Sequence, residues 1–384
     1  MKWVTVWGNA ISIAEHRVEG YAKNVTLRYP VTCSFGGDKI RLTFSNFCGS
    51  EPVTLKRVTV ASALGDREIT LNNAKVVTFN GKNELTMQPG EEIVSDPVDF
   101  HVRQGDAISV SIYIEEITQM RSAVVVTGPL SGGFFSVGDY TLKEVLPLNY
   151  TRTTSTYYFL TGIDLYGPDE RRAVICYGDS ITAQSFPDYM TKTRLDCPAN
   201  NLSVVRRAAS GTRVLREYDC ITYESYGLSG EHRFEREIKS VSGADAVIIQ
   251  HGINDIIHPV GTNINPFRPM SDLPTVEELC RGIEDYIAIA KRQGLKVLIG
   301  TLLPINGWRT YEKFREDMRR EFNGWVRNLK TVDGIVDFDS AVRDKKDITK
   351  FATGNDSGDH LHPSEQAYKL MAQAALDAIG NITR

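Results

Sequence analysis

The sequence lacks any long apolar run. None of its 384 residues belongs to a stretch approaching the ~18 consecutive apolar residues that a membrane-spanning helix needs. Strong charge of either sign is also missing, because the formal net charge is only −4. A chain without a basic excess has little electrostatic attraction for nucleic acid or for an anionic membrane surface. We therefore expect neither of these as a partner.

Cysteine is scarce and irregularly spaced. The six cysteines do not form a disulfide-like pattern, and Cys176 lies inside an apolar run, which is typical of a buried reduced thiol. The first nine residues contain one basic residue, and polar residues interrupt them too early for a secretory signal. We expect a reducing, cytoplasmic setting, although a secreted protein whose signal peptide had been removed would begin in the same way.

Helical patterns are almost absent from residues 1–168. Apolar and polar residues alternate over 39–44, after a turn at Gly36, and again over 108–114, after a turn at Gly105. Asn80-Gly81 and Pro89-Gly90 mark further breaks between short strands. Internal repeats and low-complexity segments are also missing. Several short strands at regular spacing predict an all-β sandwich or jelly-roll domain over residues 1–168.

Residues 169–384 alternate between strand and helix patterns. Apolar runs predict strands at 173–177, 202–206, 246–250, 296–301 and 334–338. One helix is predicted to open at Thr275 and to end before Gly294, and the last helix to begin at Pro363 with Leu370 on its inner face. This order is typical of a flavodoxin-like, doubly wound parallel sheet in an α/β domain over residues 169–384.

Residues with chemical potential follow the predicted strands. Since the carboxyl ends of parallel strands meet at one edge, Ser180, Gly211 and Asn254 should come together there with Asp359 and His362, which precede the last helix. The preceding glycine, at position 178, is expected to supply the positive φ of a sharp strand-to-helix turn.

Each of these residues suits one part of an acyl transfer. Ser180 is a nucleophile that needs a base, His362 is able to accept its proton, and Asp359 is able to orient the imidazole. The N–H groups of Ser180, Gly211 and Asn254 are candidates for an oxyanion hole. Each residue also has a plainer interpretation as a helix cap, turn former or solvated charge. The histidines at 16, 101, 232, 251, 258 and 360 have no assigned partner in this scheme and are interpreted as surface, core or substrate-contact residues.

Four blocks together resemble the SGNH hydrolases, also called the GDSL family of esterases and lipases. They are Gly178-Asp179-Ser180-Ile181, Ser210-Gly211-Thr212, Gly252-Ile253-Asn254-Asp255 and Asp359-His360-Leu361-His362-Pro363. The resemblance implies Ser180, His362 and Asp359 as a catalytic triad, with Gly211 and Asn254 in the oxyanion hole. The front domain is similar to the one in xylan-esterase-like members, through the segments 35–42, 45–46 and 94–98.

The resemblance implies a serine esterase that removes a small acyl group, most readily acetyl, from a carbohydrate through an acyl-enzyme. It requires neither metal nor cofactor, and its partner is a small-molecule or oligosaccharide ester. Two positions depart from the family pattern: Ile181 replaces a leucine, and Ala183-Gln184 stands where many xylan-esterase-like members have Asp-Gly. Two alternatives stay open. One is a metal-dependent phosphoesterase using Asp179, Asn254, His360 and His362, and the other is a non-catalytic carbohydrate-binding protein.

Overall fold

The computed structural model describes residues 1–14, 20–198 and 200–382. The chain forms two compact units. The first comprises Met1–Ala173, Thr191–Val205 and Val241–Gly243, and the second comprises Val174–Met190, Arg206–Ser240 and Ala244–Arg384. His16, to which the sequence assigned no role, lies outside the described residues.

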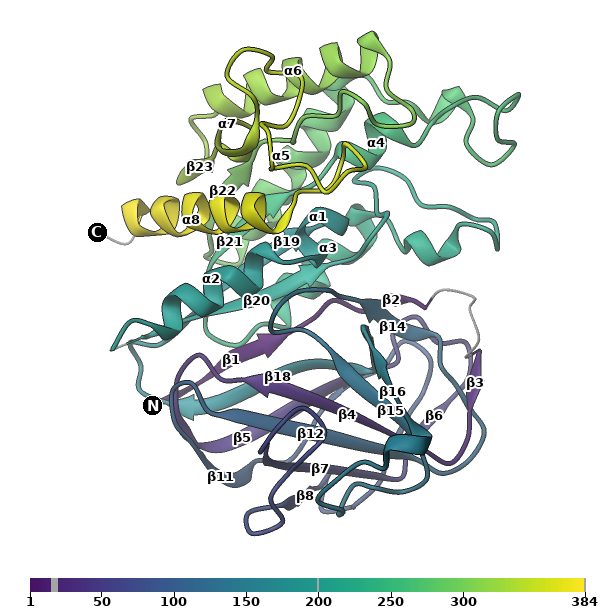
Figure 1. Cartoon of the computed structure of the whole chain (residues 1–384), viewed down its shortest axis with the longest axis vertical. Coiled ribbons are helices and arrows are strands. Elements are labelled where there is room, and N and C mark those ends of the chain that lie inside the picture. Colours follow the sequence, from purple (N-terminus) through teal and green to yellow (C-terminus); the bar gives the residue numbers. More distant parts are fainter. Residues whose placement is uncertain (15–19, 199, 383–384) are drawn as a thin grey trace. The chain divides into compact units, whose positions relative to one another are not determined.

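The N-terminal region is built from antiparallel strands, as predicted (Figure 1). One sheet has the order β1-β18-β5-β10, with β11 also paired to β5, and a second has the order β16-β15-β4-β12-β7-β8. Their bounds are β1 (Lys2–Gly8), β4 (Val25–Thr32), β5 (Gly37–Ser45), β7 (Arg57–Ser62), β8 (Lys75–Val77), β10 (Glu92–Val94), β11 (Val98–Val102), β12 (Ala107–Ile114), β15 (Gly133–Val137), β16 (Thr151–Thr154) and β18 (Leu160–Gly167).

Smaller pairings complete this region: β13-β3, β17-β14-β2 and β6-β9. These strands are β2 (Ser12–Ile13), β3 (Tyr21–Ala22), β6 (Val53–Leu55), β9 (Leu85–Met87), β13 (Thr118–Gln119), β14 (Ser122–Val125) and β17 (Thr156–Tyr158), and a short 3-10 helix η1 (Leu148–Tyr150) precedes β16.

Strand β12 is buried on both faces, although its alternating sequence is typical of a strand with one solvated face. A loop covers the polar face of β12 and is held there by Arg28 of the neighbouring strand β4. The Arg28 side chain is fully buried. Its guanidinium donates to Ser111 Oγ (3.0 Å) and to the carbonyl oxygens of Tyr140 (2.7 Å) and Lys143 (3.0 Å). Backbone carbonyls of that loop therefore satisfy the buried cation.

The C-terminal region contains the predicted doubly wound sheet, in the order β20-β19-β21-β22-β23. Strands β21 and β22, and β22 and β23, pair in parallel. All five predicted strands are present: β19 (Arg172–Gly178), β20 (Leu202–Ala208), β21 (Ala244–Gln250), β22 (Lys296–Gly300) and β23 (Gly334–Val336). Most of their side chains are apolar and buried, as expected for strands covered on both faces, although β20 also buries Ser203, Arg206 and Arg207.

Helices connect these strands (Figure 1). Helices α3, α5 and α6 pack against one another in series, and α8 packs against β23 and α7. The bounds are α1 (Ser180–Ala183), α2 (Phe186–Leu195), α3 (Gly230–Lys239), α4 (Ile253–Ile257), α5 (Val276–Arg292), α6 (Lys313–Asn328), α7 (Phe338–Val342) and α8 (Glu365–Ile382), with 3-10 helices η2 (Glu224–Tyr226) and η3 (Met270–Asp272).

The helix ends agree with the sequence in one case and differ in another. Thr275 caps α5 through a capping box with Glu278, and Gly294 follows the helix at φ +76°, as predicted. Helix α8 begins at Glu365, so the prediction of a start at Pro363 is wrong. Ser364 caps the helix instead, because its Oγ accepts the N–H of Ala367. The prediction that Leu370 lies on the inner face of this helix is also wrong, since Leu370 is exposed.

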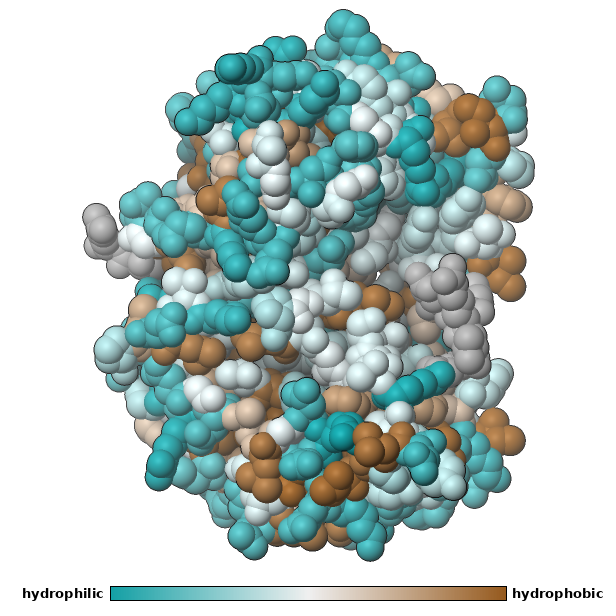
Figure 2. Space-filling model, viewed as in Figure 1, coloured by the Kyte–Doolittle hydropathy of each residue, from teal (hydrophilic) through white to brown (hydrophobic). Residues whose placement is uncertain are grey.

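Exposed apolar side chains are scattered. On the face shown in Figure 2 they form separate patches among polar residues. None of the helices that the structure describes is both long enough and apolar enough to cross a membrane.

Candidate active site

Ser180 stands at the turn that joins β19 to α1. Asp179 precedes it as the N-cap, and its carboxylate accepts the backbone N–H of Ile181 at 3.0 Å. The expectation of a positive φ at Gly178 is wrong. Glycine is needed there for space, because an added Cβ would lie 2.2 Å from the carbonyl oxygen of Gln250 and 2.5 Å from Thr182 Oγ1.

The structure brings Ser180, His362 and Asp359 together. Ser180 Oγ lies 2.9 Å from His362 Nε2, and His362 Nδ1 lies 2.6 Å from Asp359 Oδ2. Burial acts to raise the pKa of Asp359, but the hydrogen bonds from His362 and from the backbone of Leu361 outweigh it and lower that pKa to about 2. The ionised carboxylate only accepts, so Nδ1 carries the hydrogen and Nε2 is left to accept from the serine hydroxyl.

The two candidate oxyanion donors line the same pocket as Ser180. Gly211 has φ +80°, and an added Cβ would lie 2.4 Å from the ring of Tyr226, so both backbone conformation and packing demand glycine. Asn254 is 3% exposed, and its Nδ2 donates to the carbonyl oxygen of Thr212 at 2.9 Å. A carboxamide nitrogen carries two hydrogens, so this bond orients the group and leaves a second donor.

The pocket around these residues has a volume of about 260 Å³. Its walls combine the polar groups described above with apolar and aromatic side chains, a composition typical of small-molecule sites. The lining residues are Ser180, Gln184, Ser210, Gly211, Tyr226, Asn254, Ile257, His258, Trp308, Arg309, Leu361 and His362.

A family model for the GDSL-like lipases and acylhydrolases matches residues 176–370, which is half of the chain. The chain belongs to this family. It is therefore a carboxylic ester hydrolase, which excludes the non-catalytic alternative considered from the sequence. No curated protein gives a significant match to the chain.

Several solved structures are similar to part of the GDSL chain. An acetylxylan esterase from Geobacillus stearothermophilus is 17% identical, with 54% of this chain and 94% of that chain covered and a TM-score of 0.39. A GDSL-like lipase from Bacteroides thetaiotaomicron is 14% identical, with coverage of 56% and 90% and a TM-score of 0.39. An alpha/beta hydrolase from the metagenome of Lake Arreo is 17% identical, with coverage of 55% and 96% and a TM-score of 0.40.

Sequence reasoning missed a buried arginine close to Ser180 in the GDSL domain. Arg233 on α3 is 1% exposed and pairs with Glu237 at 2.7 Å. Its Nη2 donates to the carbonyl oxygen of Gly178 (2.9 Å) and to Thr212 Oγ1 (3.2 Å). The guanidinium also lies 4.6 Å from the ring centroid of Tyr177. One side chain thus links the serine loop to the loop that contains Gly211.

His251 is a second residue that sequence reasoning left without a role. It is 1% exposed, and burial, together with the nearby Arg233 charge, lowers its pKa to about 3. The neutral ring lies with Nε2 3.1 Å from the carbonyl oxygen of Thr212 and Nδ1 3.2 Å from Tyr286 Oη. A carbonyl only accepts, so Nε2 carries the hydrogen and Nδ1 accepts from the tyrosine. The Thr212 carbonyl that orients Asn254 is therefore itself fixed.

The loop after β22 forms the wall of the pocket beside His362. The ring of Trp308 is perpendicular to that of His362, with centroids 6.4 Å apart, and the guanidinium of Arg309 lies 4.6 Å from the Trp308 ring centroid. The base of this loop is held by Asn323, whose carboxamide bonds both the N–H and the C=O of Leu302 at 2.8 Å.

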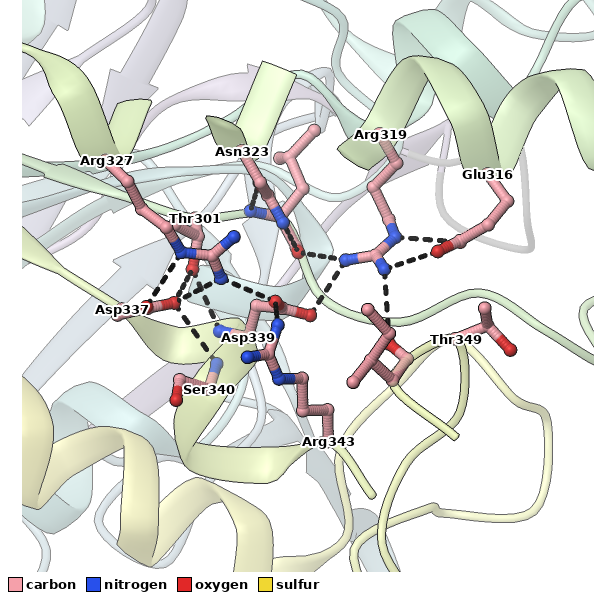
Figure 3. A network of polar contacts seen from close by, with 12 residues as sticks. Thr301, Glu316, Arg319, Asn323, Arg327, Asp337, Asp339, Ser340, Arg343 and Thr349 are labelled. Carbon is pink, nitrogen blue, oxygen red and sulfur yellow. Dashed lines mark hydrogen bonds and ion pairs between the residues drawn. The ribbon is translucent and has the colours of Figure 1, made fainter. Parts of the chain in front are cut away.

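An ionic network surrounds the start of the loop that follows β22 (Figure 3). Asp339 accepts from Arg319 (2.8 Å), Arg327 (2.6 Å) and Arg343 (2.7 Å), while Arg319 also pairs with Glu316 at 2.6 Å and donates to the Leu302 carbonyl at 3.0 Å. The network joins α6 to α7, and so stabilises the position from which the pocket loop departs.

His360, which the sequence offered as a possible metal ligand, has a different partner. Its Nδ1 contacts Asp356, its backbone has φ +64°, and its ring packs against Gly307, next to Trp308. Among the residues that the structure describes, no group of three or more His, Cys, Asp or Glu side chains is arranged to hold a metal ion.

Proposed function

We propose that this GDSL enzyme is a serine esterase that removes a small acyl group, most readily acetyl, from a carbohydrate. The observation that carries the proposal is the continuous chain of contacts Ser180 Oγ–His362 Nε2–His362 Nδ1–Asp359 Oδ2, at 2.9 and 2.6 Å, on the wall of one small pocket. Such a chain matches the geometry in which a serine hydroxyl becomes a nucleophile.

In the first step Ser180 Oγ attacks the ester carbonyl carbon while His362 Nε2 takes the hydroxyl proton. Asp359 stays ionised and stabilises the imidazolium, because its pKa is lowered to about 2. The carbonyl oxygen becomes an oxyanion, which accepts from the backbone N–H groups of Ser180 and Gly211 and from Asn254 Nδ2. Well-placed donors of this kind contribute roughly 3–4 kcal/mol each to transition-state stabilisation.

The tetrahedral species then collapses. The bond to the alcohol oxygen breaks, and His362 returns its proton to that oxygen, so that the free alcohol departs and an acyl-Ser180 ester remains. Water enters, gives a proton to His362 and attacks the acyl carbon. Collapse of the second tetrahedral species releases the carboxylic acid and restores the serine hydroxyl. No step calls on a metal or a cofactor.

The size and walls of the pocket support the choice of substrate. A volume of about 260 Å³, lined in part by the buried side chains of Ile257, His258 and Leu361, suits a short acyl chain better than a long one. Tyr226 and Trp308, which line the same pocket and are only half-buried, offer aromatic surface on which the C–H face of a sugar ring can pack. An oligosaccharide ester is accordingly the proposed partner.

The acyl preference is tested with p-nitrophenyl esters of two to eight acyl carbons and with peracetylated xylose. We expect kcat/KM to be highest for acetate, to fall steadily with chain length, and to be accompanied by release of acetate from the sugar. A preference for the octanoyl ester, with no acetate released from the sugar, would show that the pocket has been misjudged.

A further inference from the structure

The wall beside His362 contains one charged residue. Arg309 lines the pocket with Ser180 and His362, is exposed, and stacks on Trp308. Trp308 in turn contacts the ring of His362 edge-on. The Arg309 guanidinium is therefore linked through Trp308 to His362, the proposed general base and acid.

This position identifies the side of the substrate that faces Arg309. The inference rests on the proposed function, in which His362 returns its proton to the oxygen of the departing alcohol. The alcohol must then lie against His362, and hence against Trp308 and Arg309. Arg309 thus faces the alcohol part of the ester.

The charge of Arg309 is not balanced within the pocket. The lining contains no Asp or Glu, and within the described residues Arg309 has neither an ion pair nor a hydrogen bond to a carboxylate. Two buried arginines nearby do have a carboxylate partner: Arg213 pairs with Asp272 at 3.0 Å, and Arg233 pairs with Glu237 at 2.7 Å. A cation held in place without a counterion, at the mouth of a small pocket, favours an anionic ligand.

We propose that Arg309 selects an ester whose alcohol part carries a carboxylate, such as an O-acetylated sugar acid, over its neutral counterpart. Stacking on Trp308 holds the guanidinium plane, so that two parallel N–H donors are available to one carboxylate. The aromatic ring below it then supports the apolar face of the same sugar.

The experiment compares kcat/KM for O-acetylated glucuronic acid with that for O-acetylated glucose at low ionic strength. The wild type is expected to prefer the acid about five- to tenfold, the range of an exposed charge-assisted contact. Arg309→Met keeps the side-chain stem and should reduce this ratio to near one, while Arg309→Lys should keep part of it. Added salt should lower the wild-type ratio and leave that of Arg309→Met unchanged.

Arg320→Met provides the matched control, since Arg320 is an exposed arginine on α6 outside the pocket lining. It should leave the ratio at its wild-type value, which excludes an effect of overall charge. Equal rates on both sugars for the wild type, or a preference that survives in Arg309→Met, would overturn the inference and leave the esterase standing. If the wild type cleaves no acetyl ester at all, the proposed function is wrong and the role of Arg309 falls with it.

Discussion

Arg233 Nη2 donates a hydrogen bond to the carbonyl oxygen of Gly178, 2.9 Å away. Gly178 ends the strand that leads to Ser180, and the same guanidinium nitrogen also bonds Thr212 Oγ1, one residue after Gly211. The loops of the proposed nucleophile and of a proposed oxyanion donor are therefore held by a single buried cation. The reaction rate falls steeply when catalytic groups are displaced. The contacts of Arg233 should therefore affect kcat as well as stability.

Removing the cation should separate these two effects. Arg233→Met leaves the buried Glu237 carboxylate with the longer contact to Arg236 at 3.4 Å, and we expect the free energy of unfolding to fall by about 3–5 kcal/mol. Adding Glu237→Met removes this poorly paired charge and should restore most of the melting temperature, because a buried ion pair is replaceable by apolar side chains. The double variant should nevertheless keep a kcat roughly 10–100-fold below the wild type. Full recovery of kcat together with stability would mean that Arg233 is only structural.

Substitutions of Asn254 test whether its side chain is part of the oxyanion hole. Its Nδ2 donates to Thr212, and no cap of α4 depends on its side chain, since Gly252 occupies the N-cap position. Asn254→Ala should lower kcat and kcat/KM alike by roughly 10²–10³-fold, with little change in KM. Asn254→Asp should be at least as poor, because a carboxylate offers no donor and repels the oxyanion. An active Asp variant beside an Ala variant that merely melts earlier would identify Asn254 as a turn residue.

The stability of the protein should depend on the ionisation of Asp179. Burial raises the pKa of this carboxyl from its usual 3.8 to about 7. Between these values the unfolded chain loses a proton that the folded protein retains, so the stability contributed by the protonated form is lost as pH rises toward 7. Asp179→Asn cannot ionise, and its free energy of unfolding relative to the wild type should improve by about 1–3 kcal/mol between pH 5 and pH 8.

Chemical denaturation of both proteins at a series of pH values measures that difference. Asp255, whose burial raises its pKa to about 6, titrates in both proteins and largely cancels. A difference between variant and wild type that stays constant from pH 5 to pH 8 would show that Asp179 is already ionised in the folded protein.

The network under the pocket loop predicts a large loss of stability from a small change. Asp339 is 1% exposed and accepts from three arginines, so Asp339→Asn removes the charge that they share, while Arg319 keeps Glu316 and Arg327 keeps Asp337. We expect a loss of about 1.5–3 kcal/mol in the free energy of unfolding. Asp317→Asn on the same region of α6 breaks only an exposed pair with Lys313 and should change stability by less than about 1 kcal/mol. Similar melting temperatures for the two variants would contradict this account of the network.

The sequence predicted the parallel sheet and the edge of that sheet at which the candidate site residues lie. Continuous apolar runs mark strands covered on both faces, and the geometry of a parallel sheet then brings Ser180, Gly211 and Asn254 to one edge. The start of the last helix was wrongly predicted at Pro363. Ser364, one residue later, caps the helix because its side chain offers an acceptor that proline lacks. At Gly178, glycine was expected for its backbone freedom, whereas the structure requires it for space.

The supporting residues could not be predicted in the same way. Arg233 and His251 are polar residues at buried positions, and their partners are backbone carbonyls of distant loops that no spacing in the sequence brings together. Trp308 and Arg309 follow β22 without a recognisable motif, so only the folded loop shows that they line the pocket. Local patterns identify elements and motifs, whereas these contacts depend on tertiary packing.

The central claim is that Ser180, activated by His362 and oriented by Asp359, is the nucleophile. The most direct test is mass spectrometry of the protein after reaction with an aryl sulfonyl fluoride, followed by mapping of the modified peptide. We expect one adduct per chain, on Ser180, with loss of esterase activity in proportion to labelling and much slower labelling in His362→Ala. An adduct on any other residue, or full esterase activity in a protein labelled completely at Ser180, would contradict it.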